Sequence, residues 1–136
     1  MHIDKYKQSD GTYCATDGCE YLSAEDFIQS EILGFCLCAN PKVSLNLVHR
    51  ALTLIKNHWD NGANADNSYL YQCWKEYEIS QRIDFHYYEI WLFIMYYLDS
   101  KKLTEHGGSV DGAWLTQKGY DLLEDLDELL PKEFEK

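Results

Sequence analysis

Apolar side chains recur every three or four residues in five stretches of the chain, which is the spacing of one face of an α-helix. The first stretch runs from residue 23 to a point before Pro41, and the others are residues 43–59, 69–82, 84–98 and 116–130. Ser23 can cap the first helix, with Glu25 and Asp26 in its first turn, and Thr116 can cap the last. The pattern therefore predicts a mainly helical protein.

The stretch at 84–98 is the most apolar part of the chain. From residue 87 to residue 98, a run of 12 residues, only Glu89 is charged. A helix with so few polar positions is typically buried, so we expect it to be covered nearly all round and to lie at the centre of the core. The run is too short for a bilayer span, which needs about 20 residues, so no membrane association is expected.

Two short segments change to a strand-like pattern. Residues 102–106 and 113–116 carry it, and the glycine-rich residues 107–112 between them predict a hairpin. Turn-forming residues at 60–68 predict a loop. Residues 1–22 follow neither a helical nor a strand spacing for long, so an additional interaction is needed to hold them in place.

The predicted fold is mainly α with a small β-hairpin. A cysteine-bearing extension with one helix takes residues 1–40, and a second domain takes residues 41–136.

The carboxyl-terminal half resembles a known DNA-binding fold. The runs at residues 98–108 and 115–123 are similar to the winged helix-turn-helix domains of MarR- and PadR-type regulators, most sharply at Leu115-Thr116-Gln117-Lys118-Gly119. The resemblance covers roughly residues 45–130. It implies a winged-helix-like domain at 41–136, a groove-reading helix at 84–98 and a wing at 105–112. It also implies a transcription regulator that dimerises through its terminal helices.

The charge balance argues against DNA as the partner. The chain has 12 Lys and Arg residues against 23 Asp and Glu, a net charge of −11. Proteins that bind DNA draw much of their affinity from Lys and Arg side chains that neutralise phosphates. The implied reading helix has none before Lys101, and the implied wing carries Glu105, His106 and Asp111. We therefore expect no nucleic-acid binding.

Aromatic residues are abundant, with 11 Tyr, 4 Trp and 5 Phe. Aromatic side chains anchor protein interfaces and charge steers the partner, so we expect a non-enzymatic module that binds a basic protein. The expected contact residues are Tyr87, Tyr88, Glu105, His106 and Trp114. An aromatic core beneath an acidic, solubilising surface is the alternative interpretation.

The size, acidity and cysteine-bearing lead segment are similar to small accessory proteins of phages and prophages. That resemblance implies an inhibitor that blocks a basic site on a bacterial defence or nucleic-acid-processing complex in the host cytoplasm. The amino-terminal residues show no signal-peptide core, which is also the pattern of a cytoplasmic protein.

Four cysteines form two close pairs, an arrangement found in structural zinc sites. Cys14 and Cys19 lie in a turn-rich segment, and Cys36 and Cys38 lie at the end of the first predicted helix, just before Asn40 and Pro41. One zinc ion on these four thiolates would also staple residues 1–22. Two other interpretations stay open, namely a core Cys36 with an incidental amino-terminal pair, or a redox or catalytic dithiol.

No group of residues in the sequence has the types and spacing of a catalytic site, so we expect no enzyme activity. The five histidines are scattered, and nothing in the sequence pairs them with a nucleophile. Gly107 and Gly108 lie in a predicted hairpin and not between a strand and a helix, where glycines cradle phosphate. The terminal helix and the residues after it carry carboxylates expected mostly on the solvated side: Glu124, Asp125, Asp127, Glu128, Glu133 and Glu135.

Overall fold

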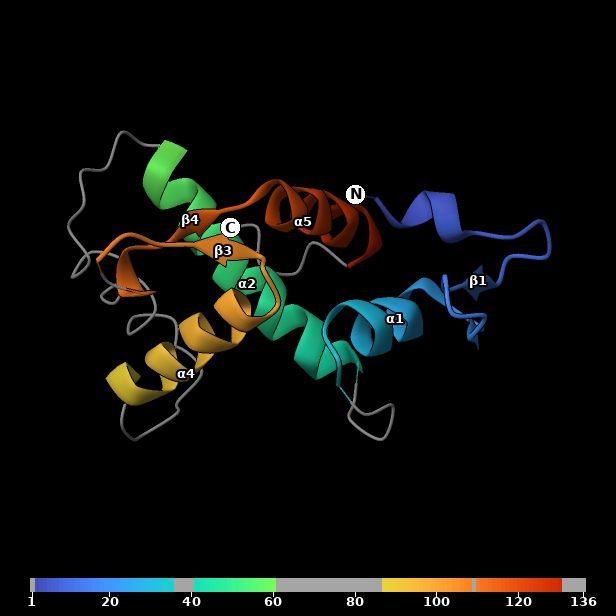
Figure 1. The fold of residues 1–136 in the computed structure, drawn as a ribbon, viewed down its shortest axis with the longest axis horizontal. Coiled ribbons are helices and arrows are strands. Elements are labelled where there is room, and N and C mark those ends of the chain that lie inside the picture. The colour runs from blue at the N-terminus through green and yellow to red at the C-terminus, as the bar shows by residue number, and fades with distance from the viewer. Residues whose placement is uncertain (1, 36–40, 61–86, 109, 131–136) are drawn as a thin grey trace. The chain divides into compact units, whose positions relative to one another are not determined.

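The computed structural model describes residues 2–35, 41–60, 87–108 and 110–130, which Figure 1 draws in colour. The chain divides into two compact units. Unit 1 combines residues 1–49 with residues 121–136, and unit 2 takes residues 50–120. The predicted loop at 60–68 falls almost entirely outside the described residues, and the predicted helix at 69–82 falls wholly outside them.

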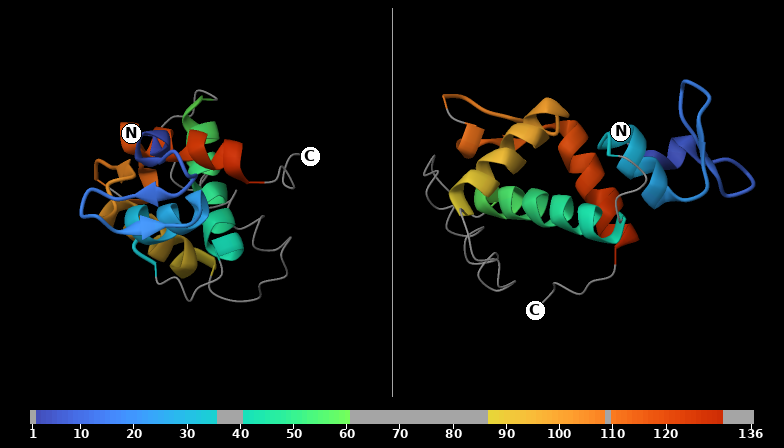
Figure 2. Two further views of the ribbon diagram at one scale, coloured as in Figure 1. Left: turned by 90° about the vertical axis from the view of Figure 1, so that its right-hand side faces the viewer. Right: turned by 90° about the horizontal axis from the view of Figure 1, so that it is seen from below.

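Unit 1 begins with a 3-10 turn and a hairpin that the sequence pattern did not indicate. The turn, η1, covers Ile3–Tyr6, and the strands β1 (Tyr13–Cys14) and β2 (Glu20–Tyr21) pair antiparallel, with Tyr13 opposite Tyr21. The pair is visible in the left view of Figure 2. Gly18 has a φ of 92°, which a side chain would strain, and the Asp17 carboxylate accepts from the Cys19 amide to close the turn.

The first predicted helix starts where expected and ends earlier. Helix α1 covers Ala24–Phe27, and the Ser23 side chain accepts a hydrogen bond from the Asp26 amide at 3.1 Å, which confirms Ser23 as its N-cap. The chain then widens into a π-helical segment, η2 (Ile28–Ile32). Gly34 follows with a φ of 70°, the left-handed conformation that commonly ends helices.

Aromatic packing holds the amino-terminal segment in unit 1. The Phe27 ring lies within 5.0, 5.8 and 5.7 Å of the rings of Tyr6, Tyr13 and Tyr21, measured between centroids. Phe27 itself is only 3% exposed. Because these rings come from η1, from both strands and from α1, the cluster supplies a staple for residues 1–22 that needs no metal.

Two longer helices contribute to both units. Helix α2 covers Pro41–Asp60 and confirms the helix predicted at 43–59, with Pro41 as its first residue. Helix α5 covers Gln117–Leu129, and the Thr116 hydroxyl accepts from the Gly119 amide at 3.1 Å, which confirms Thr116 as its cap. The buried apolar residues of unit 1 are Ile3, Tyr13, Ala15, Ala24, Phe27, Ile28, Leu33, Leu45, Val48, Leu122, Leu123 and Leu126.

Unit 2 contains the predicted hairpin. Helix α4 covers Tyr87–Ser100, and it is followed by β3 (Thr104–Glu105), the 3-10 turn η3 (Val110–Gly112) and β4 (Trp114–Leu115). The two strands pair antiparallel, and β3 contacts α4 (Figure 1). The buried apolar residues of unit 2 are Ala51, Leu52, Ile55, Trp91, Met95, Leu98, Leu103, Val110, Ala113 and Leu115.

The described residues are therefore mainly helical, with two small antiparallel two-stranded sheets. The mainly helical class and the hairpin between residues 102 and 116 are confirmed, whereas the β1–β2 sheet was not predicted. Within these residues, no helix combines the length and apolar character that crossing a bilayer requires.

Candidate protein-interaction face

Helix α4 has one buried side and one exposed side. Trp91, Met95 and Leu98 are fully buried. Glu89, Phe93, Tyr96 and Ser100 are exposed, with Phe93 at 78% and Tyr96 at 61%. At about 100° per residue, these four positions fall within an arc of about 60°. We call this set of four residues the α4 face.

The expectation that this helix is buried nearly all round is therefore wrong. Only Glu89, Asp99 and Ser100 are polar among its 14 residues, so composition alone cannot show which side faces outward. The spacing of the polar residues does indicate the exposed side. Glu89 and Ser100 are 11 residues apart, which is close to three helical turns, so both lie on the same side of the helix. Phe93 and Tyr96 lie on that side, and sequence reasoning missed them as surface residues.

The charge of the helix matches that of the whole chain. Glu89 and Asp99 are its only ionisable residues besides tyrosine, so α4 carries two negative charges and no positive one. Asp99 Oδ1 lies 3.7 Å from His106 Nε2 in the hairpin. Phe93 and Tyr96 therefore lie on a helix that carries negative charge only.

The partner-binding residues predicted from the sequence lie in two places. Tyr87 and Tyr88 open α4, but their side chains lie outside what the structure describes. Glu105 and His106 are exposed on and just after β3, and Trp114 on β4 is 41% exposed. Their assignment to an interface stays a prediction.

Trp114 packs on a second tryptophan. Its ring meets the Trp59 ring edge-on, with centroids 6.1 Å apart, and Trp59 Nε1 donates to the Ala113 carbonyl at 2.8 Å. This pair ties β4 to the end of α2 within unit 2. Part of the Trp114 side chain thus packs within unit 2, whereas Phe93 and Tyr96 are largely exposed to solvent.

Three lysines gather where α4 meets the hairpin and α5. Lys118 Nζ donates to the Lys101 carbonyl at 2.9 Å. Burial, and then the positive charges of Lys101 and Lys102, lower the pKa of Lys118. Lys101 Nζ also lies 5.9 Å from the centre of the Tyr97 ring. Two of the three ammonium groups therefore also contact the protein itself.

Tyr97 lies beside the α4 face and is partly buried. Burial raises the pKa of its phenol to about 12 from its ordinary value near 10. The neutral phenol is thus favoured in the folded chain, and this stabilisation is fully present below pH 10 and lost as the pH rises to about 12.

We expect alkaline pH to destabilise the wild-type protein more than the Tyr97→Phe variant. Denaturant unfolding at a series of pH values between 9 and 12 measures the difference. Tyr96→Phe changes the exposed neighbouring tyrosine and serves as the control. An unfolding free energy with the same pH dependence in the wild type and Tyr97→Phe would contradict the assigned burial of this phenol.

The predicted zinc ligands are only partly described. Cys14 is half-buried on β1 with its thiol donating to the Ala15 carbonyl at 3.5 Å, and Cys19 is exposed just before β2. A hydrogen bond with Asp17, and the charge of that carboxylate, raise the pKa of the Cys19 thiol. Cys36 and Cys38 lie outside the described residues. A four-cysteine zinc site therefore stays a prediction.

No protein-family model matches this chain, and neither a curated protein nor a solved structure matches it.

Proposed function

We propose that this chain is an acidic protein-binding module that docks on a basic surface of a partner protein through the α4 face. The single observation that carries the proposal is the exposure of Phe93 and Tyr96 on a helix whose opposite side is fully buried. The buried side fixes the helix, so a partner meets two pre-positioned aromatic anchors. Covering each anchor would gain about 1.5–3 kcal/mol of apolar burial.

The chemistry of the partner follows from charge. The chain carries −11, and α4 has no basic residue. A second copy of the chain would bring another −11 to the interface, so electrostatic repulsion disfavours self-association, whereas a Lys- and Arg-rich surface is attracted. Proteins that process nucleic acids present such surfaces because they bind phosphates. An acidic module seated there would exclude the nucleic acid and act as an inhibitor.

The experiment immobilises the wild-type chain and two variants on beads and exposes them to lysate of the organism that encodes it. One variant carries Phe93→Ser and Tyr96→Ser. The matched control carries Leu22→Ser, which changes an apolar side chain that is 85% exposed and lies in unit 1. We expect a basic protein to be retained by the wild type and the control, to be lost with the double variant, and to elute with salt.

Three results would overturn the proposal. The first is that no basic protein is retained, or that retention is equal for all three chains. The second is a concentration-dependent dimer in sedimentation that the double variant abolishes, which would make a second copy the occupant. The third is binding of duplex DNA by the wild type. Lys101, Lys102 and Lys118 would then account for a log–log salt slope of about −2.7, and the regulator implied by the winged-helix resemblance would be favoured.

A further inference from the structure

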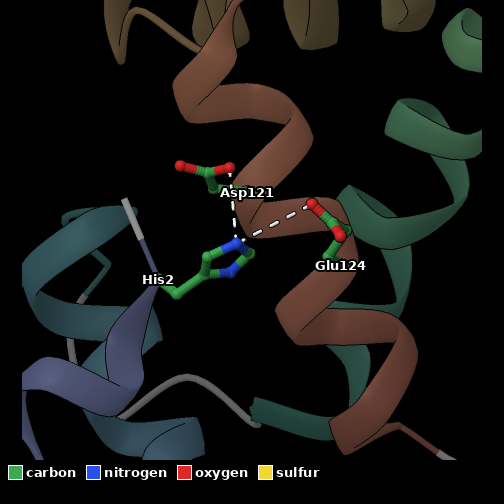
Figure 3. Close-up of side chains that lie close together, drawn as sticks. All are labelled: His2, Asp121 and Glu124. Carbon is green, nitrogen blue, oxygen red and sulfur yellow. Dashed lines mark ion pairs between the residues drawn. The ribbon is translucent and has the colours of Figure 1, made fainter.

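The structure brings together a histidine and three carboxylates from opposite ends of the chain. His2 lies beside Asp121, Glu124 and Asp125 of α5, all within unit 1 (Figure 3 draws His2 with Asp121 and Glu124). Asp125, expected on the solvated side of the terminal helix, is only 7% exposed, as is Asp121. His2 contacts both carboxylates, and the Ile3 amide also contacts Asp125.

Asp125 positions the histidine ring. The His2 Nδ1–H donates to Asp125 Oδ1 at 3.0 Å, and the Ile3 amide donates to Asp125 Oδ2 at 3.0 Å. One buried carboxylate therefore holds both the backbone and the ring of this segment. With the proton on Nδ1, the other ring nitrogen, Nε2, is turned toward Asp121 and Glu124. A carboxylate on the far nitrogen is the usual support of a metal-ligating histidine.

The distances between His2 Nε2 and the two carboxylate oxygens are close to those between ligands of one metal ion. Nε2 lies 3.5 Å from Asp121 Oδ1 and 3.8 Å from Glu124 Oε1, and the three ligand atoms all lie within 4.8 Å of one another. Both Nε2–oxygen distances exceed the usual N–H···O hydrogen bond of about 2.7–3.2 Å. Ligands on one ion with bonds of about 2.1 Å at tetrahedral angles are about 3.4 Å apart. Asp121 and Glu124, three residues apart on α5, can reach one ion from one side.

We propose that His2, Asp121 and Glu124 bind a borderline divalent cation of the Zn²⁺ class, with Asp125 as the positioning residue. One imidazole nitrogen and two carboxylate oxygens suit Zn²⁺ better than Ca²⁺ or Mg²⁺, which prefer oxygen alone, or Cu⁺, which prefers sulfur. The side chains of His2 and Glu124 are 46% and 65% exposed, so the site opens to solvent and leaves room for water ligands. The bound ion would fasten the amino-terminal segment to α5.

The ligand atoms distinguish the proposed site, which has nitrogen and oxygen ligands, from a four-cysteine site, which has sulfur ligands. The metal-free protein, carrying a histidine-free tag at its carboxyl end, is titrated with Zn²⁺ by calorimetry and with Co²⁺ by absorbance. In the Cys14→Ser variant, which lacks one thiolate of the four-cysteine site, we expect a nitrogen- and oxygen-ligated cobalt spectrum without the charge-transfer band of a thiolate. Zn²⁺ should also raise the midpoint of thermal unfolding, because the ligand set is assembled only in the folded chain.

Two variants of α5 test the assignment. Glu124→Gln should weaken Zn²⁺ binding at least about tenfold, since changes to supporting residues alone commonly cost that much. Glu128→Gln makes the same substitution at another exposed position of α5 and should bind like the wild type. Absence of binding by the Cys14→Ser variant, or an affinity unaffected by Glu124→Gln, would each overturn the proposal. The first result would leave His2 and the three carboxylates as an ordinary cluster of polar side chains without a metal.

Discussion

Replacing Trp91 with alanine is expected to destabilise the protein by about 3–5 kcal/mol, the usual cost of truncating a fully buried tryptophan. Trp91 is the largest fully buried side chain among the described residues, and it lies on the buried side of α4. Its removal leaves a cavity on the buried side of α4. Denaturant unfolding followed by circular dichroism measures the loss.

The control for Trp91→Ala lies two residues along the same helix. Phe93 is of similar aromatic character but 78% exposed, so Phe93→Ala should change stability by no more than about 0.5 kcal/mol. Equal destabilisation by both substitutions would show that Phe93 is covered in the folded chain. The α4 face would then lose its main anchor, and the proposed function would fail with it.

Gly119→Ala is the second substitution with a large expected effect. A Cβ at this position would lie 2.1 Å from the carbonyl oxygen of Leu103, closer than real Cβ atoms approach. The clash is with backbone, which also accepts from the Thr116 amide at 3.1 Å, so no side chain can rotate away. We expect a loss of about 3 kcal/mol, at the upper end of overpacking costs.

Gly107→Ala and Gly108→Ala are the matched controls for Gly119→Ala. A Cβ at either position meets nothing within 4 Å, so neither variant should be clearly destabilised in denaturant unfolding. Wild-type stability of Gly119→Ala would contradict the close approach of α5 to the segment before β3.

Local signals in the sequence predicted the local structure well. Ser23 and Thr116 both cap helices as their side chains and positions indicate, because capping depends on neighbours three residues away. The hairpin formed where glycines separate two strand-like segments, although its strands are only two residues long. The α2 boundaries agree within two residues, since its apolar spacing is regular and Pro41 fixes the start.

The sequence did not predict which side of each element is buried or which distant residues come into contact. Composition made α4 look covered on all sides, whereas tertiary packing buries only the side that carries Trp91. The contact of His2 with Asp125 joins residues 123 positions apart, and no local pattern can indicate it. The same holds for His49 Nε2, which lies 2.6 Å from Asp127 Oδ1. Histidines that look scattered along the chain thus meet the acids of α5 only after folding.

The measurement that tests the proposed function most directly is the affinity of the purified chain for the purified basic partner, compared with that of the Phe93→Ser and Tyr96→Ser double variant by calorimetry at fixed salt. Circular dichroism first establishes that both chains have the same helix content and stability. If the α4 face binds the partner, the double variant should bind at least roughly 100-fold more weakly, as expected when two anchor residues are lost. An affinity within about threefold of the wild type would place the interface elsewhere and contradict the account.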